Sequence, residues 1–253
     1  MRIHSWGFPR CGTTYLMYAL ADVYALEPEA RFDEPLHWSD DDGSLVGKPP
    51  IDIRRRLMRL EFIHDEVQDQ PRAMVKHHHE HGWCLKHQHP DMWKDYVDLF
   101  DYNIFLFRSN QIYRSISNAI QTGYALKVDR KRYRIPVTQF VKLCISYIES
   151  LIYAGLISDD VVYDEVVCYE SMPTDPMELA NWLNISDVYP LQRTNRVRPH
   201  LIYKEKNWEQ DCENYDELVA ALREAQKPYQ ELIPQLFDGL HINTRYLEDR
   251  LSK

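Results

Sequence analysis

A glycine turn between an apolar strand and an apolar helix most constrains what this chain can fold into. Residues 1–6 (MRIHSW) predict a short strand, and residues 7–14 (GFPRCGTT) form the turn. Apolar residues then recur at helical spacing through residues 13–26. A strand, a glycine turn and a helix in this order open a βαβ unit. The whole chain has only 8 glycines, so two of them within one turn are informative.

The rest of the chain continues the alternation of strands and helices. Strands are predicted at residues 73–78, 103–107 and 161–168, and helices at 51–69, 90–100, 110–122, 138–156, 176–183 and over most of 215–240. Residues 31–50, which include a run of aspartates and a pair of prolines, predict an irregular surface loop. Residues 103–107 (NIFLF) are continuously apolar, as in a strand buried on both faces of a parallel sheet. The sequence therefore predicts an α/β fold: a single domain over residues 1–253, built as a three-layer α/β/α sandwich around a central parallel sheet.

The charge of the chain limits its partners. The formal net charge is −9, whereas a general nucleic-acid partner would require a basic surface. We therefore expect no nucleic-acid partner. Any anion site must be a local basic pocket in an otherwise acidic body.

The cysteines and the absence of a long apolar run bear on the compartment. The 5 cysteines are scattered without a CxxC pair, which favours reduced thiols. No secretory signal fits ahead of the first predicted strand. No uninterrupted apolar run reaches the roughly 18 residues that a membrane span needs. We expect a cytoplasmic protein without a membrane partner.

The turn at residues 7–14 is nearly a P-loop. Its spacing is GxxxxG followed by two threonines, so that Thr13 stands where a nucleoside-triphosphate P-loop has lysine. Glycines would still let successive backbone N–H groups point at a phosphate from the start of the helix. Without the lysine, a 5′-phosphate bearing one further anionic group fits better than a triphosphate, and Arg10 supplies positive charge. The structural alternative is a plain strand-to-helix turn capped by Thr13.

The stretch GFPRCGTTYL resembles the 5′-phosphosulfate loop of sulfotransferases that use 3′-phosphoadenosine 5′-phosphosulfate (PAPS). The resemblance implies that Arg10 lies beside the transferred sulfuryl group and that Tyr15 lies near the adenine. It further implies a PAPS-binding loop formed by Pro9, Arg10, Cys11, Gly12, Thr13 and Thr14. Cys11 replaces the usual serine of the family, so a contact from that side chain does not carry over.

A second motif of the family follows the apolar strand at residues 103–107. Arg108 comes directly after this strand, and Arg114 and Ser117 stand as Arg-x-x-Ser on the next predicted helix. The family pattern is similar to RxPxxRxxS, but this sequence lacks the proline and has one extra residue. The resemblance implies that Arg108 and Ser117 bind the 3′-phosphate, with Ser115 as the alternative serine. Arginine forks suit phosphate oxygens, although both arginines could also be ordinary surface residues.

Three weaker similarities extend the resemblance along the chain. Residues 32–36 (FDEPL) are similar to an FEPL-like element of carbohydrate sulfotransferases, and residues 168–172 (CYESM) are similar to a YEDL segment. A basic stretch containing Arg196 and Arg198 falls where the family closes a segment over the 3′-phosphate.

A histidine-rich stretch holds the candidate general base. Six of the 11 histidines lie within residues 77–89, which raises the alternative of a metal site. Residues 76–78 (KHH) resemble the KTH-like element of cytosolic sulfotransferases, which implies His78 as the base. Glu34 is the alternative by similarity to carbohydrate enzymes, and Glu80 stays open.

The resemblance implies a sulfotransferase that moves a sulfuryl group from PAPS to a hydroxyl or amine of a small-molecule or carbohydrate acceptor, with no metal required. One alternative is a P-loop-type kinase with a degenerate lysine. Such a kinase would need Mg²⁺ and a strand ending in aspartate, whereas residues 103–107 are followed by Arg108. The other alternative is a catalytically inactive protein that binds PAPS.

Overall fold

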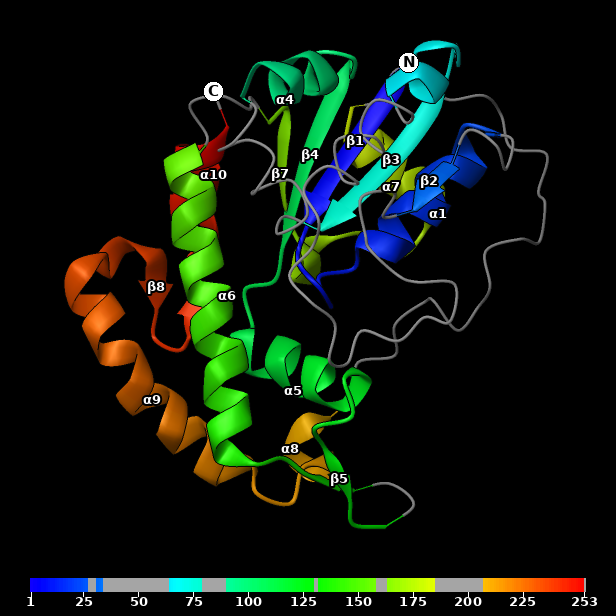
Figure 1. Ribbon diagram of the computed structural model, residues 1–253. Helices are drawn as coiled ribbons and strands as arrows, with labels where there is room; N and C mark the ends of the chain where they lie inside the picture. The colour runs from blue at the N-terminus through cyan, green and yellow to red at the C-terminus, as the bar shows by residue number, and fades with distance from the viewer. Residues whose placement is uncertain are drawn as a thin grey trace.

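The computed structural model describes residues 1–26, 31–33, 64–78, 90–129, 132–157, 163–184 and 207–252. Strands and helices alternate along this part of the chain (Figure 1). The strands of the main sheet are β1 (Arg2–Gly7), β2 (Arg31–Asp33), β3 (Ala73–His78), β4 (Tyr102–Phe107) and β7 (Glu165–Cys168). The helices are α1 (Thr13–Val23), α4 (Pro90–Val97), α5 (Gln111–Gln121), α6 (Val137–Ile157), α7 (Pro176–Trp182), α8 (Trp208–Asp211), α9 (Tyr215–Leu232) and α10 (Thr244–Leu251).

The main sheet is parallel throughout, in the order β2-β3-β1-β4-β7. This confirms the predicted α/β class and its central parallel sheet. The register aligns Gly7 at the end of β1 with His78 on β3 and with Leu106 on β4. The glycine turn therefore begins at the same edge of the sheet as the segments that follow β3 and β4.

The strand order contains a switch point between β1 and β4. After β1 the chain crosses towards β2 and β3, whereas after β4 it crosses towards β7 on the opposite side. Neighbouring strands whose connections diverge in this way leave a crevice beyond their carboxyl ends, where α/β proteins bind ligands. The loops after β1 and β4 lie at this switch point in the strand order.

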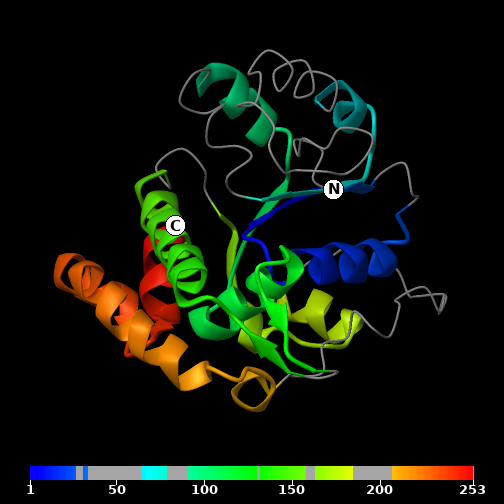
Figure 2. The same cartoon turned by 60° about the horizontal axis from the view of Figure 1, so that its bottom comes forward.

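Side chains that alternate along each strand build two separate cores. Residues such as Trp6, Phe105 and Val166 pack against α4, α6 and α10, whereas Ile3, Leu106 and Val167 face α1 and α7. Helices thus cover both faces of the sheet in three layers, as Figure 2 shows. A third cluster joins α5, the first half of α6, α8 and α9 beyond the carboxyl edge of the sheet.

The expectation of a surface loop over residues 31–50 was wrong at its start. Residues 31–33 form β2, in parallel register with residues 74–76 of β3. Such a short edge strand is too brief to show an alternating pattern in the sequence. Residues 34–50 lie outside the described residues.

The expectation of helix over most of residues 215–240 was confirmed, and only the last part of this range has another structure. Helix α9 ends at Leu232, and a 3₁₀ turn begins at Pro234. The antiparallel strands β8 (Phe237–Asp238) and β9 (His241–Ile242) follow, joined through Gly239 with φ 60°. Proline and a left-handed glycine both favour a turn over a continuing helix. The sequence also missed α10 and the hairpin of β5 (Leu126–Lys127) and β6 (Tyr133–Arg134).

The four described cysteines, Cys11, Cys144, Cys168 and Cys212, are buried free thiols. In the part of the chain that the structure describes, no helix combines the length and the apolar character needed to cross a membrane.

Two histidines lie side by side in the core between the sheet and α4. The rings of His4 and His77 are 5.1 Å apart, and Nε2 of His77 is 2.8 Å from the hydroxyl of Tyr96. His4 stacks on Phe100, and its Nδ1 is 3.3 Å from Oδ1 of Asn103. Burial lowers the pKa of His4 from 6.5 to about 3, and the hydrogen bond with Asn103 only partly opposes this shift. His4 is therefore neutral in the folded protein at neutral pH.

This burial predicts acid sensitivity. The unfolded chain binds a proton at His4 below pH 6.5, whereas the folded chain does so only near pH 3, so stability is lost as the pH falls between these values. At pH 5 the loss from this group should be about 2 kcal/mol of unfolding free energy. Urea unfolding gives the free energy of unfolding at pH 7.5 and at pH 5. The fall between the two pH values should be smaller in His4→Gln than in the wild type by about that amount. His241→Gln, which removes an exposed histidine, is the matched control. An equal pH dependence in His4→Gln and the wild type would contradict the prediction.

Candidate functional site

The glycine turn is held in a tight left-handed conformation. Arg10 has φ 69° and Gly12 has φ 85°, and the N–H of Cys11 donates to the carbonyl of Phe8 at 3.1 Å. A Cβ atom on Gly12 would lie 2.5 Å from Cδ2 of Tyr169, so this position needs glycine for space as well as for φ. Gly12 is also the N-cap of α1, without a side-chain cap. The alternative in which Thr13 caps the helix is therefore wrong, because Thr13 is already its first residue.

Arg10 joins the two motifs that the sequence singled out. Its Nε donates to Oγ of Ser117 at 2.9 Å, and its Nη1 donates to Oε1 of Gln121 at 3.3 Å. Both acceptors lie on α5, far along the chain from the glycine turn. Ser117 is thus the serine of α5 that meets the turn, while Ser115 is fully buried in the same helix.

Lys76 brings a second cation to the glycine turn. It lies on β3 with only 2% of its surface exposed, and its Nζ donates to Oγ1 of Thr14 at 3.0 Å. The sequence reasoning missed this residue and used it only to align His78. Its signal in the sequence was a lysine near the end of a predicted buried strand, where a charge needs a polar partner. An amine from a neighbouring strand therefore reaches the turn whose own motif lacks lysine.

The Arg114 side chain donates hydrogen bonds to backbone carbonyls of the site. Its Nε donates to the carbonyl of Pro9 at 3.1 Å, and its Nη1 donates to the carbonyl of Leu143 at 3.1 Å. Its guanidinium also lies over the ring of Tyr147, with Cζ 4.3 Å from the ring centre. Arg114 is buried, so it fixes the glycine turn to α5 and α6.

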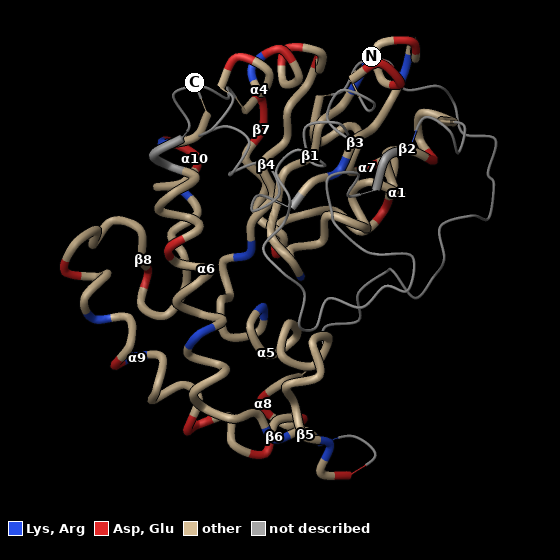
Figure 3. The backbone as a smooth tube through the Cα atoms, viewed as in Figure 1, with Lys and Arg blue, Asp and Glu red and all other residues tan. Residues whose placement is uncertain are grey.

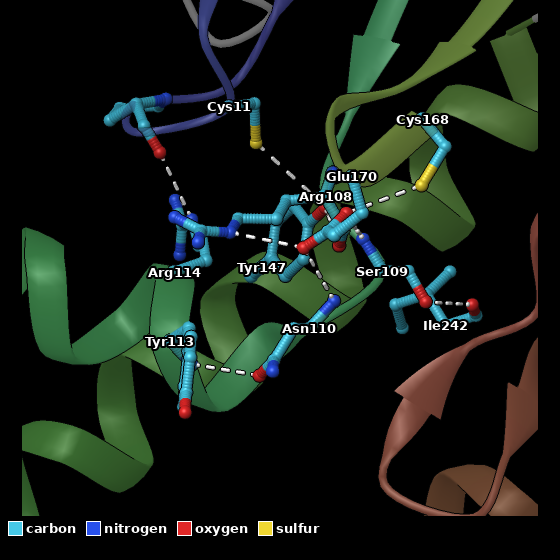
Figure 4. A network of polar contacts seen from close by, with 11 residues as sticks. Cys11, Arg108, Ser109, Asn110, Tyr113, Arg114, Tyr147, Cys168, Glu170 and Ile242 are labelled. Carbon is cyan, nitrogen blue, oxygen red and sulfur yellow. Dashed lines mark hydrogen bonds and ion pairs between the residues drawn. The ribbon is translucent and has the colours of Figure 1, made fainter. Parts of the chain in front are cut away.

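Tyr147 of α6 ties the end of β4 to the glycine turn (Figure 4). Its hydroxyl accepts from the N–H of Arg108 and donates to the carbonyl of Arg108, both at 2.8 Å. The Cys11 thiol also donates to the Tyr147 hydroxyl oxygen, at 3.9 Å. Burial, chiefly, raises the pKa of Tyr147 well above its ordinary value, so the hydroxyl keeps its proton. Burial likewise raises the pKa of the Cys11 thiol, which argues for a packing role for Cys11.

Arg108 lies between a carboxylate and an aromatic ring. Its Nε donates to Oε1 of Glu170 at 3.1 Å, and its Cζ lies 4.7 Å from the ring centre of Tyr169. The Arg108 side chain is 6% exposed and that of Glu170 is 34% exposed. Sequence reasoning did not single out Tyr169 and Glu170 as site residues, although they stand in the YEDL-like segment.

The remaining predicted residues fall into two groups. Tyr15 is buried, and its hydroxyl donates to the carbonyl of Thr174 at 2.6 Å, so it packs α1 against the segment before α7. The backbone of His78 ends β3 opposite Gly7, within the described residues. Glu34, Glu80, Arg196 and Arg198 lie outside the described residues.

Charge is distributed unevenly around the site. Figure 3 shows basic positions on β3, after β4 and on α5, and these belong to Lys76, Arg108 and Arg114. A separate depression at the start of α9 contains one arginine and several carboxylates, so it does not suit an anion. Its lining includes Arg134, Glu209, Glu213, Asp216 and Glu217.

The structure describes only the first two residues of the histidine-rich stretch at residues 77–89. Among the described residues, no group of three histidine, cysteine or carboxylate side chains is arranged to hold a metal ion. Residues 79–89 of the stretch lie outside this part of the chain.

Comparisons of the chain with family models, with curated proteins and with solved structures found no match. Arg10, Lys76 and Arg108 place three cationic side chains around the ends of β1, β3 and β4, next to the start of α1. Such an arrangement can bind a polyanionic ligand and stabilise negative charge that develops on it.

The Tyr147 hydroxyl should be important for stability. Tyr147→Phe keeps the ring beside Phe8 and Arg114 but leaves the buried N–H and carbonyl of Arg108 without this partner. The free energy of unfolding should fall by about 1–3 kcal/mol, the cost of unsatisfied buried polar groups. Urea unfolding measures the change, and Tyr124→Phe, at an exposed tyrosine, is the control. A loss below about 0.5 kcal/mol would show that the hydroxyl is dispensable.

Proposed function

We propose that this protein is a PAPS-dependent sulfotransferase. The observation that carries the proposal is the hydrogen bond between Arg10 and Ser117. It joins a turn similar to a 5′-phosphosulfate loop to a helix serine from a motif similar to a 3′-phosphate site. The two motifs were singled out separately in the sequence, and they meet at the edge of the sheet where α/β proteins bind ligands.

The proposed donor site uses residues on both sides of this junction. The turn from Pro9 to Thr14 would hold the 5′-phosphosulfate, with backbone N–H groups at the start of α1 and with Lys76 beside Thr14. Arg108 and Ser117 would hold the 3′-phosphate, and Tyr15 would lie near the adenine. Arg196 and Arg198 would close over the nucleotide. These last roles follow from the family resemblance.

The proposed reaction is a single in-line displacement. The acceptor oxygen or nitrogen attacks sulfur, and the bond between sulfur and the bridging oxygen of the 5′-phosphate breaks. The bridging oxygen keeps the electron pair, so adenosine 3′,5′-bisphosphate leaves with added negative charge. Arg10 and Lys76 would stabilise that charge, and the acceptor proton would pass to His78, with Glu34 or Glu80 as alternatives. No metal enters this scheme, and the acceptor would be a small molecule or a carbohydrate.

A small-molecule or nucleotide kinase is the second candidate. The hydrogen bond between Lys76 and Thr14 favours it, because this amine could act on a transferred phosphoryl group. Against it, β4 is followed by Arg108 and not by a carboxylate that could hold Mg²⁺. A catalytically inactive protein that binds PAPS would bind the same nucleotide without turnover.

Ligand-induced stabilisation separates the two enzyme classes. Adenosine 3′,5′-bisphosphate should raise the melting temperature, because a ligand that binds only the folded state stabilises it by linkage. ATP with Mg²⁺ should raise it much less. The measurement is a thermal shift series in ligand concentration, with adenosine 5′-monophosphate as the control that lacks the 3′-phosphate. The opposite ranking of the two nucleotides would favour the kinase.

Arg10 should act mainly in the transition state. Arg10→Ala should lower turnover by about two to three orders of magnitude, the loss that follows removal of one charge-stabilising donor. Affinity for adenosine 3′,5′-bisphosphate should fall much less, since interactions that strengthen only in the transition state appear in kcat. Sulfuryl transfer from labelled PAPS to a panel of acceptors gives the rate, and calorimetry gives the affinity.

The control for this variant is Arg223→Ala, which removes the same charge from an exposed position on α9. Arg10→Ala with unchanged turnover would remove Arg10 from the chemistry. Parallel losses in turnover and in nucleotide affinity would instead assign Arg10 to ground-state binding.

A further inference from the structure

Glu170 is the centre of a polar cluster at the end of β4. Its carboxylate accepts from Nε of Arg108 at 3.1 Å, from the N–H of Ser109 at 3.0 Å and from the N–H of Asn110 at 3.2 Å. The Cys168 thiol donates to it at 3.2 Å. Figure 4 shows Glu170 close to Arg108 and to both residues of the turn that leads into α5. One side chain from beyond β7 thus fixes the whole turn after β4.

The contacts of Glu170 set the orientation of the Arg108 guanidinium. The hydrogen bond from Nε turns one edge of the planar guanidinium towards the Glu170 carboxylate. The face of the guanidinium lies over the ring of Tyr169. Tyr147 meanwhile fixes the backbone N–H and carbonyl of Arg108. With both backbone and guanidinium fixed, little conformational freedom of Arg108 is left to be lost when an anion binds.

We propose that Glu170 is a positioning residue that holds Arg108 ready for the 3′-phosphate of the nucleotide. The proposal rests on the proposed function, since it concerns the ligand of that same site. Glu170 would not contact the phosphate itself, because its carboxylate and the 3′-phosphate are both negatively charged and repel each other. It acts through Arg108, and its bonds to the N–H groups of Ser109 and Asn110 hold Glu170 itself in place beside that arginine.

Two substitutions test the position and the charge of this carboxylate. Glu170→Gln keeps the length of the side chain and removes its charge, whereas Glu170→Asp keeps the charge and shortens the side chain. Either change should lower affinity for adenosine 3′,5′-bisphosphate by roughly tenfold, the scale of one hydrogen bond to a charged group. Affinity for adenosine 5′-monophosphate should stay unchanged, because it has no 3′-phosphate. A purely structural defect would weaken both ligands together.

The matched control is Glu178→Gln, which removes the same charge from an exposed carboxylate in the first turn of α7. Calorimetry with both nucleotides gives the affinities, and circular dichroism with thermal unfolding reports whether each variant is folded. If Glu170→Gln does not fold, Glu170→Asp supplies the same comparison without a change in net charge.

A double-mutant cycle then identifies the residue through which Glu170 acts. Arg108→Ala should lower affinity for the bisphosphate, and adding Glu170→Gln to it should have no further effect. Additive losses would show that Glu170 acts independently of Arg108 and would overturn the proposal. A gain in affinity in Glu170→Gln would also overturn it, since the carboxylate would then compete with the phosphate for Arg108.

The failure of the proposed function gives a different result. A wild-type protein that binds both nucleotides equally, or neither, has no 3′-phosphate site, and the role of Glu170 falls with it. In another outcome, the wild type binds the bisphosphate more tightly than the monophosphate, and Glu170→Gln and Glu170→Asp keep the same preference. The proposed donor site then stands. That outcome overturns only the role of Glu170.

Discussion

The site depends on the two hydrogen bonds between the Tyr147 hydroxyl and the backbone of Arg108. They attach α6 to the end of β4, and the same tyrosine ring carries the guanidinium of Arg114, which in turn bonds the carbonyl of Pro9. The loops after β1 and β4 are therefore fixed to one buried aromatic residue. A hydroxyl that both accepts and donates suits this position, because it satisfies two backbone groups that the sheet does not pair at its end.

The arginines of the site divide into one that supports the structure and two that can meet a ligand. Arg114 is buried and its donors reach backbone carbonyls, whereas Arg10 is half-buried and bonds side chains on α5. Arg108 is also largely buried, and the carboxylate of Glu170 orients its guanidinium at the end of β4. An acidic chain can thus maintain a basic site, because the cations are concentrated where three strands end.

Local pattern in the sequence predicted most of the main sheet and the helices around it. Residues 73–78 form β3 as predicted, and α5 and α6 differ from their predicted ranges by about one residue at each end. The sequence pattern did not predict elements that are very short, such as β2, or the turn and short strands that follow the end of α9. The proximity of the glycine turn and Ser117 could be predicted because both stand in recognisable motifs, and the hydrogen bond between Arg10 and Ser117 shows that they lie together. Lys76, Tyr147 and Glu170 could not, since their roles come from contacts between distant segments that no local pattern records.

The central position of β1 has a consequence for the order of folding. The first strand of the chain pairs with β3 on one side and with β4 on the other, so neither neighbour exists when β1 leaves the ribosome. One edge of β1 cannot pair until residues 102–107 have been synthesised, so the pairings that form the centre of the sheet are far apart in sequence. Folding limited by such distant pairings is slow and exposes apolar segments for longer. The nascent chain is thus most exposed to misfolding and chaperone binding while β1 lacks both of its partners.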